Sequence, residues 1–152
     1  MRRILITTIA TMLLVSGCAT KIKTYEGPEK LMQDIALIKC NPYVQVNGVD
    51  GNKSHRVSAG GGLWYRDCEI SVLPGPHTFD VCFDESYSTG TMNVTRRCGQ
   101  DIPVQIDAQA GRIYRIKYES KSGRWKPWIE DVTEEELAKI EEERRNQAAE
   151  KK

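Results

Sequence analysis

Residues 68–83 read CEISVLPGPHTFDVCF and hold two alternating runs on either side of a turn. In 68–72 every second residue is apolar, and the pattern returns in 79–83. A period of two is typical of half-buried β-strands. Between the runs, Pro74 presets φ and Gly75 tolerates a positive φ, which favours an open type II turn. This part of the chain therefore predicts two strands joined by a turn.

Strand-like segments continue on both sides. They begin with the apolar run Ile35–Ile38 and recur about every 8 to 12 residues up to Ile129, separated by turn residues. This spacing predicts an all-β fold, a small β-sandwich of about six to eight antiparallel strands. Pro103 has no N–H for a sheet ladder, so the strand around 102–106 is expected to lie at an edge or to pair through its other side.

The pattern changes at Thr133, where a C-terminal α-helix is expected to begin. Thr133 and Glu136 have the spacing of a capping box. The apolar stripe that follows contains little more than Leu137 and Ile140. A charged, solvated tail is therefore favoured over a helix that binds a partner.

The first residues have the pattern of an export signal. Arg2 and Arg3 precede an almost wholly apolar run, Ile4–Val15, which is too short to span a membrane comfortably. The following Val-Ser-Gly-Cys at 15–18 resembles the bacterial lipobox. That resemblance implies removal of residues 1–17 as a signal peptide and attachment of fatty acyl chains such as palmitate to Cys18. An ordinary secretory signal with a structural Cys18 is the alternative.

The expected organisation follows from these segments. Residues 18–33 are interpreted as a lipid-anchored tether, 34–132 as the β-sandwich domain and 133–152 as the charged C-terminal helix or tail. By resemblance to lipoproteins of Gram-negative bacteria, Ala19 in place of Asp implies anchoring in the outer membrane rather than the inner one. Whether the domain faces the periplasm or the cell surface stays open.

Four cysteines remain once Cys18 is assigned to the lipid. An even number in an oxidising periplasm favours two disulfides. Zinc is the competing use, but no two cysteines form a C-x-x-C pair and the chain has two histidines. Sequence alone does not select among the three possible connectivities. We favour Cys40–Cys68 and Cys82–Cys98, the latter because a turn near Gly90 would let its strands face each other.

Charge and motifs exclude several functions. Without Arg2 and Arg3, 20 Lys and Arg face 21 Asp and Glu, so nucleic acid is not an expected partner. The chain has no Gly-x-Ser-x-Gly, Ser-x-x-Lys or His-Glu-x-x-His motif. No catalytic residue, metal site or cofactor is predicted. His55 and His77 are interpreted as turn-packing residues.

Aromatic side chains are the best candidates for a recognition surface, since exposed rings stack on sugars or anchor partners. The alternative is that they cover the edges of a small core. The candidates are Trp64, Tyr65, Tyr87, Trp125 and Trp128.

Four short motifs carry a family resemblance: Tyr25–Pro28, Ile35–Ile38, Leu73–His77 and Ala110–Tyr114. With them, residues 18–131 resemble a group of small, uncharacterised bacterial lipoproteins, and the Leu-Pro-Gly-Pro-His stretch is similar to PEGA-type surface domains. The resemblance implies a β-sandwich with envelope or carbohydrate-contact roles, and no catalytic residues.

We therefore expect a lipid-anchored, non-catalytic envelope module that binds or scaffolds a protein or peptidoglycan. One alternative is a periplasmic inhibitor that plugs a lytic enzyme with the loop Gly60–Tyr65. A second is an enzyme with an unfamiliar site, for which a pocket joining His77 to carboxylates would be required.

Overall fold

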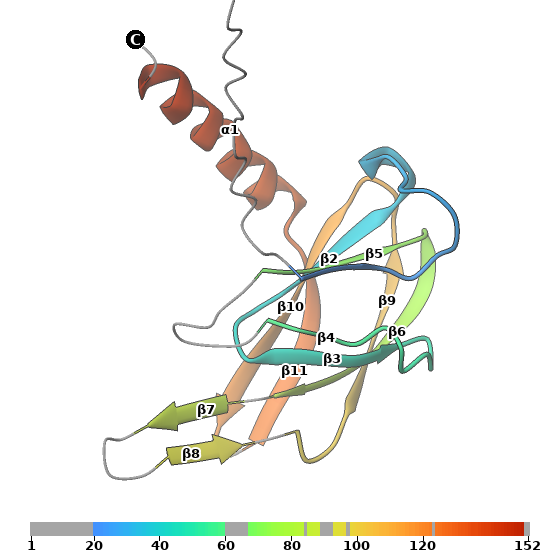
Figure 1. The fold of residues 1–152 in the computed structure, drawn as a ribbon, viewed down its shortest axis with the longest axis vertical. Coiled ribbons are helices and arrows are strands. Elements are labelled where there is room, and N and C mark those ends of the chain that lie inside the picture. Colours follow the sequence, from blue (N-terminus) through green and yellow to red (C-terminus); the bar gives the residue numbers. More distant parts are fainter. Residues whose placement is uncertain are drawn as a thin grey trace, which may run out of the picture.

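Two β-sheets and one C-terminal helix make up the fold (Figure 1). The computed structural model describes residues 20–59, 67–83, 85–88, 93–96, 98–122 and 124–150, the side chains of 85–88, 93–96 and 150 excepted. The first sheet has the strand order β1-β5-β2-β10-β11, the second β4-β3-β6-β9, and β7 and β8 form a separate two-stranded ribbon.

The strands are β1 Thr20–Lys23, β2 Ala36–Cys40, β3 Val44–Val49, β4 Val57–Ser58, β5 Cys68–Val72, β6 Gly75–Phe83, β7 Glu85–Ser88, β8 Asn93–Arg96, β9 Ile102–Ala108, β10 Ile113–Lys121 and β11 Arg124–Asp131. A short 3-10 helix, Met32–Asp34, precedes β2, and α1 spans Thr133–Glu150. The all-β sandwich with a C-terminal helix is confirmed. The described residues form eleven strands, more than the six to eight expected.

Strand direction departs from the prediction at two places. β1 pairs with β5 in parallel, and β10 pairs with β2 in parallel, whereas all strands were expected to be antiparallel. A period of two identifies a strand and its buried face but contains nothing about the direction of its neighbour. The remaining pairs in both sheets are antiparallel.

The turn in 68–83 connects the two sheets. β5 belongs to the first sheet and β6 to the second, so Leu73 and Pro74 carry the chain across the sandwich. Gly75 begins β6 with φ of 129°. A Cβ at Gly75 would meet nothing within 4 Å, so the backbone conformation, not crowding, favours glycine there.

The core lies between the sheets and is built from the alternating apolar positions of their strands. Burying a valine, isoleucine or phenylalanine stabilises a fold by about 1.5–3 kcal/mol. Among the described residues, the largest fully buried side chains are Phe79, Ile38, Ile70, Ile116, Val44, Val46, Val49, Val72, Val81, Cys68 and Cys82.

The expected tether is partly strand. β1 pairs with β5 from Thr20 to Lys23, and Ile22 packs against the core. The interpretation of 18–33 as a tether is therefore wrong for these four residues. The segment TKIK has one apolar side chain, too few to display a period.

The sandwich is nearly closed along both sides. β11 lies beside β9, and β1 beside β4, so each edge of one sheet approaches an edge of the other. β9 is an edge strand, as Pro103 predicted, and β11 contains Pro127. A proline lacks the backbone N–H that a further strand would need as a hydrogen-bond donor, so both prolines discourage pairing at these edges.

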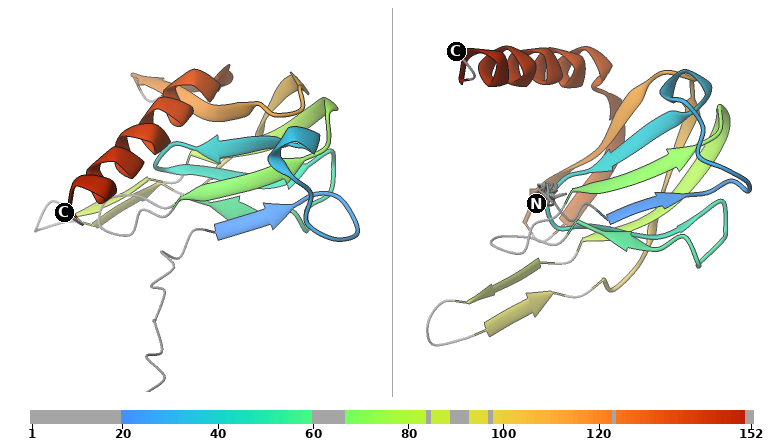
Figure 2. Two further views of the ribbon diagram at one scale, coloured as in Figure 1. Left: turned by 90° about the horizontal axis from the view of Figure 1, so that it is seen from above. Right: turned by 45° about the horizontal axis from the view of Figure 1, so that its top comes forward.

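Helix α1 leaves the first sheet and projects away from the sandwich (Figure 2). Its first backbone bond runs from Glu136 N to Val132 O at 2.9 Å. Leu137 and Ile140 are exposed, in agreement with the expectation of a solvated helix. Among the described residues, no helix has the length and apolar character needed to cross a membrane.

Candidate functional site

The hairpin of β10 and β11 carries the two candidate tryptophans that the structure describes. Its strands pair without interruption from Tyr114 opposite Asp131 to Lys121 opposite Arg124. Ser122, which follows β10, has φ of 52°, the positive value that two-residue hairpin turns require.

Trp125 and Trp128 lie on opposite faces of this hairpin, because they are three positions apart on one strand. Trp125 is half-buried and packs against the core. Trp128 is on the outer face, 38 % exposed, and its indole N–H donates to Glu130 Oε2 at 3.3 Å. The two rings therefore belong to different faces, as the period of two already indicates, and a role of either ring in recognition stays a prediction.

Trp125 belongs to an aromatic cluster at one end of the sandwich. The ring centroid of Phe83 lies 5.9 Å from Trp125, 4.9 Å from Tyr118 and 5.9 Å from Tyr43. All three pairs are tilted, a geometry that aromatic rings favour. Packing against Phe83 therefore fixes the Trp125 indole in one place.

A cavity of about 610 Å³ lies beside Trp125 at the end of the hairpin. Among the described residues, its lining includes the exposed cations Lys121, Arg124 and Lys126 and the carboxylate of Glu119. Strand alternation places these four side chains on the outer face of the hairpin, opposite the face of the Trp125 ring. Within the described part of the chain, none of the three cations forms an ion pair. We call this the Trp125 pocket; its lining residues are Glu119, Lys121, Ser122, Arg124, Trp125 and Lys126.

Further along the same hairpin, charges on the outer face are paired. Lys117 Nζ lies 3.1 Å from Glu130 Oε2, the oxygen that also accepts from Trp128. The hydrogen bond from Lys117, followed by that from Trp128, holds the pKa of Glu130 below its ordinary value. This part of the face is internally satisfied, which distinguishes it from the Trp125 pocket.

Several predicted site residues lie outside the described residues. Cys18, Trp64 and Tyr65 are among them, as is the loop Gly60–Tyr65. For Tyr87 the structure describes the backbone in β7 and not the side chain.

Glu136 forms a buried ionic cluster that the sequence did not reveal. Its carboxylate bonds to Lys39 of β2 and Arg115 of β10, and Lys139 Nζ lies 3.4 Å away. Burial acts to raise the pKa of Glu136, but the hydrogen bond from Lys39 and the charges of Lys39, Arg115 and Lys139 outweigh it and keep the pKa below its ordinary value. This cluster fastens the first turn of α1 to the first sheet.

The predicted capping box is therefore wrong. The Thr133 hydroxyl accepts from Ile113 N at 2.9 Å and donates to Asp131 Oδ1 at 2.6 Å. Asp131 Oδ1 also accepts from Thr133 N at 2.9 Å. Burial acts to raise the pKa of Asp131, but these bonds from Thr133 and the charge of Arg112 leave it lowered. Tertiary contacts with β10 have replaced the local bonds that a capping box would make.

His77 joins two turns. Its Nδ1 lies 2.6 Å from Asp50 Oδ2 and its Nε2 lies 2.7 Å from Leu73 O. Asp50, with φ of 52°, also accepts from Thr78 N at 2.8 Å. Both ring nitrogens are thus engaged, and His77 packs in a turn as expected. His55 has intermediate exposure in its polar turn.

Both disulfides expected from the cysteine count are present, as Cys40–Cys68 and Cys82–Cys98, each with a Cα–Cα distance of 5.3 Å. Two disulfides indicate an oxidising, extracytoplasmic compartment. The β7–β8 pairing, with Glu85 opposite Arg96, continues from the Cys82–Cys98 bond, and the turn expected at Gly90 lies outside the described residues.

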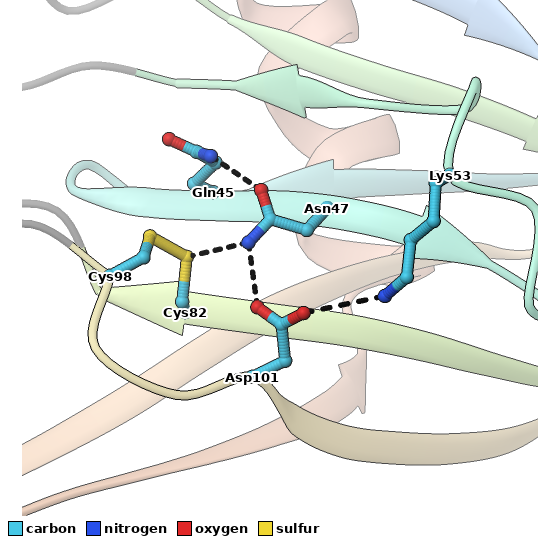
Figure 3. The surroundings of a disulfide bond; sticks show 6 residues. All are labelled: Gln45, Asn47, Lys53, Cys82, Cys98 and Asp101. Carbon is cyan, nitrogen blue, oxygen red and sulfur yellow. Dashed lines mark hydrogen bonds and ion pairs between the residues drawn. A yellow bond between two sulfur atoms is a disulfide. The ribbon is translucent and has the colours of Figure 1, made fainter.

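Polar side chains surround the second disulfide (Figure 3). Asn47 Nδ2 donates to Cys82 Sγ at 3.2 Å and to Asp101 Oδ1 at 2.6 Å, and the amides of Gln45 and Asn47 are hydrogen-bonded. Lys53 Nζ lies 3.3 Å from Asp101 Oδ2. The network ties strands β3 and β6 to the segments that hold Lys53 and Asp101.

Within the residues that the structure describes, no group of three or more His, Cys, Asp or Glu side chains could hold a metal ion. No protein-family model, curated protein or solved structure matches the chain. The resemblance to small lipoproteins and PEGA-type domains therefore stays a prediction, and function has to be inferred from the chain's own residues.

Proposed function

We propose that this protein is a lipid-anchored, non-catalytic binding module of the bacterial cell envelope, held in the outer membrane through Cys18. The export signal and the Val-Ser-Gly-Cys sequence at 15–18 support the anchor. The two disulfides support an oxidising location outside the cytoplasm. Its partner is another envelope component, a protein or peptidoglycan.

The Trp125 pocket is the observation that carries the binding role. An open surface depression of about 610 Å³ is lined by three exposed cations on the outer face of the hairpin, and none of them forms an ion pair within the described residues. Arginine is enriched where proteins recognise partners, which makes Arg124 the most informative of the three cations.

The position of β1 supports close attachment to the membrane. Thr20 is two residues after Cys18, and Thr20 N donates to Asp67 O at 2.8 Å. Thr20 pairs with Cys68, which is bonded to Cys40. With acyl chains on Cys18, the sheet would begin within about 7 Å of the anchor along an extended chain.

The anchor is tested by mass spectrometry of the N-terminal peptide from the mature protein. We expect a peptide that begins at Cys18 and carries acyl chains. A free thiol at residue 18, or an uncut leader, would refute the anchor.

The binding role is tested by photocrosslinking in intact cells. A photoreactive residue at Glu119, in the Trp125 pocket, should give discrete adducts that are absent when the same residue replaces Gln105, which is exposed on β9 of the other sheet. Identical patterns at both positions would contradict a role for the pocket.

The two alternatives are the inhibitor and the enzyme. The loop Gly60–Tyr65, on which an inhibitor would depend, lies outside the described residues. For an enzyme, a cavity of about 400 Å³ does join His77 to Asp107, and Asp50 Oδ2 lies 2.6 Å from His77 Nδ1. Against catalysis, oxygens of Asp50 and Leu73 engage both ring nitrogens, so neither nitrogen is free to face a substrate.

A further inference from the structure

We propose that the end of the β10–β11 hairpin rests on the anionic headgroups of the leaflet that holds the acyl chains of Cys18. We call this part the hairpin end; it comprises Lys121, Ser122, Arg124 and Lys126. The inference rests on the proposed lipid anchor. It adds a second contact with the membrane, which would fix how the sandwich stands on the bilayer.

The strand directions place the hairpin end where the anchored chain enters the sandwich. Thr20 pairs with Cys68, which is bonded to Cys40. Cys40 pairs in turn with Ile116, so one row of residues crosses the first sheet from β1 to β10. β10 is parallel to β2, β2 is antiparallel to β5, and β5 is parallel to β1. β10 therefore runs opposite to β1, and beyond Ile116 it extends toward the end at which β1 starts.

The anchor is short compared with the reach of the hairpin. Cys18 stands two residues before Thr20, so it lies within about 7 Å of Thr20 even along an extended chain. Lys121 stands five residues beyond Ile116, which places it about 16 Å past the row. The β7–β8 ribbon extends from the second sheet at the same end (Figure 1). A bilayer that meets this end of the sandwich therefore meets the hairpin end as well.

Charge favours this end as the one that faces the bilayer. Lys121, Arg124 and Lys126 are exposed and form no ion pair within the described residues, and Glu119 is the carboxylate beside them. An anionic leaflet attracts a nearby Lys or Arg by roughly fivefold in the contact equilibrium. After Glu119 is subtracted, two net positive charges remain, so contact should be favoured by more than about tenfold.

Contact with a leaflet requires an open surface, not an enclosed cavity. The cations lie beside the turn on the outer face of the hairpin, around an open depression. Lysine and arginine have long side chains, so cations next to the turn can reach headgroups that approach the hairpin from its end. The outer face further from the turn, around Trp128, then stays open to the partner of the proposed function.

The test uses the mature, acylated protein in phospholipid vesicles and a water-soluble reagent that acylates lysine. Mass spectrometry compares the labelling rate of Lys121 in vesicles of phosphatidylglycerol and of phosphatidylcholine. We expect phosphatidylglycerol to slow the labelling at least about fivefold, and added salt to reverse the effect. Lys53, which is 61 % exposed and follows β3 of the other sheet, is the internal control and should be labelled alike in both. Equal rates at Lys121 in the two kinds of vesicle would overturn the proposal.

Arg124→Gln tests whether the cations of the hairpin end act together. The substitution removes an exposed charge with no ion pair in the described residues, and Lys121 should lose most of its protection in phosphatidylglycerol. Lys53→Gln is the matched control and should leave the protection of Lys121 unchanged. Equal losses in the two variants would show diffuse charge attraction and overturn the proposed contact.

The outcomes separate this inference from the proposed function. Protein adducts at position 119 in cells, together with equal labelling of Lys121 in the two kinds of vesicle, would overturn the membrane contact and leave the binding role intact. Protection of Lys121 in phosphatidylglycerol without adducts in cells would support the membrane contact and count against the binding role. A mature protein without acyl chains on Cys18 would refute the anchor and the membrane contact together.

Discussion

Glu136 is the residue on which the attachment of α1 depends. It is 5 % exposed and lies between Lys39 and Arg115, which come from two neighbouring strands of the first sheet. An ion pair between exposed side chains contributes little to stability, whereas breaking a buried one leaves uncompensated charge. The side chains of Lys39 and Arg115 are only 25 % and 23 % exposed, so the cluster behaves as a buried ion pair.

Replacing Glu136 by Gln should therefore destabilise the fold. We expect the free energy of unfolding to fall by about 2 kcal/mol, because Lys39 and Arg115 would lose their shared anion. Urea denaturation followed by circular dichroism measures the change. Glu135→Gln is the matched control: that side chain is exposed and pairs with Lys139, so a smaller effect is expected. Equal effects of the two substitutions would contradict the assignment.

Asp50 has two separate roles in its turn, and substitutions can separate them. It adopts a positive φ, and its carboxylate receives a bond from Thr78 N and faces His77. Asp50→Ala should cost about 1–2 kcal/mol, since alanine disfavours this φ and accepts no hydrogen bond. Asp50→Asn should cost less, because asparagine tolerates this φ and retains one acceptor. Denaturation midpoints of the two variants give the comparison, and a reversed order would refute it.

At the scale of the element, α1 has an attached beginning and a free remainder. Its first turn is bound through Thr133 and Glu136, whereas Leu137 and Ile140 are exposed. Three acidic residues in the first turn interact favourably with the positive end of the helix dipole. At its base, the helix is therefore held by the ionic cluster of Glu136. Beyond its second turn, it depends on the intrinsic helix propensity of its residues.

Acid should weaken the attachment of α1. The pKa of Glu136 is lower in the folded chain than its ordinary value of 4.5, so its stabilisation is complete above that value and is lost as the pH falls through the folded pKa. The difference in unfolding free energy between the wild type and Glu136→Gln should shrink as the pH is lowered from about 6 to about 3. A difference that stays constant over this range would show that the Glu136 charge is not responsible.

The two disulfides should differ in what they contribute. Cys40–Cys68 closes 28 residues and Cys82–Cys98 closes 16. If a disulfide acts by lowering the entropy of the unfolded chain, these two loops stabilise the folded state by about 3.5 and about 3 kcal/mol. Paired Cys→Ser substitutions should therefore destabilise the protein more at Cys40 and Cys68, also because both of these side chains are buried in the main core. Thermal or urea unfolding of the two double variants tests the order.

At the scale of the whole molecule, the sandwich begins at Thr20, well before the boundary expected at residue 34. Ile22→Ala should lower the free energy of unfolding by about 1–2 kcal/mol, since its side chain is partly buried against the core. Lys21→Ala, an exposed neighbour on β1, should change it little. If the two substitutions behave alike in urea denaturation, β1 contributes no packing and the segment acts as a tether.

Sequence patterns predicted most of the sandwich because its strands are half-buried and alternate cleanly, as in 68–72 and 102–106. Asp50 and Gly51 both have positive φ and form a turn, as the Asp-Gly sequence favours. Features that depend on distant partners were not predictable. Parallel pairing of β10 with β2 has no local signal, and Glu136 looked like a capping residue until the fold placed two cations beside it.

The candidate site was predicted in part. Aromatic residues pointed to the end of the hairpin, and Trp125 is there, in contact with Phe83. The cations that line its pocket are ordinary surface residues in the sequence, and only the hairpin register brings Lys121 and Arg124 opposite each other. Spacing within a strand was informative, whereas proximity between strands required the structure.

The parallel pairing of β1 with β5 has a mechanical consequence. If Cys18 carries acyl chains as proposed, a pull on them would load β1 along its own length. The backbone bonds that join the ends of β1 to the β5 segment, from Thr20 N to Asp67 O and from Thr24 N to Ser71 O, cross that direction. Such bonds must shear together rather than unzip singly. Force that reaches Cys68 passes through the sulfur bridge to Cys40, on the central strand β2. Tension from the bilayer would thus be spread over the middle of the sheet.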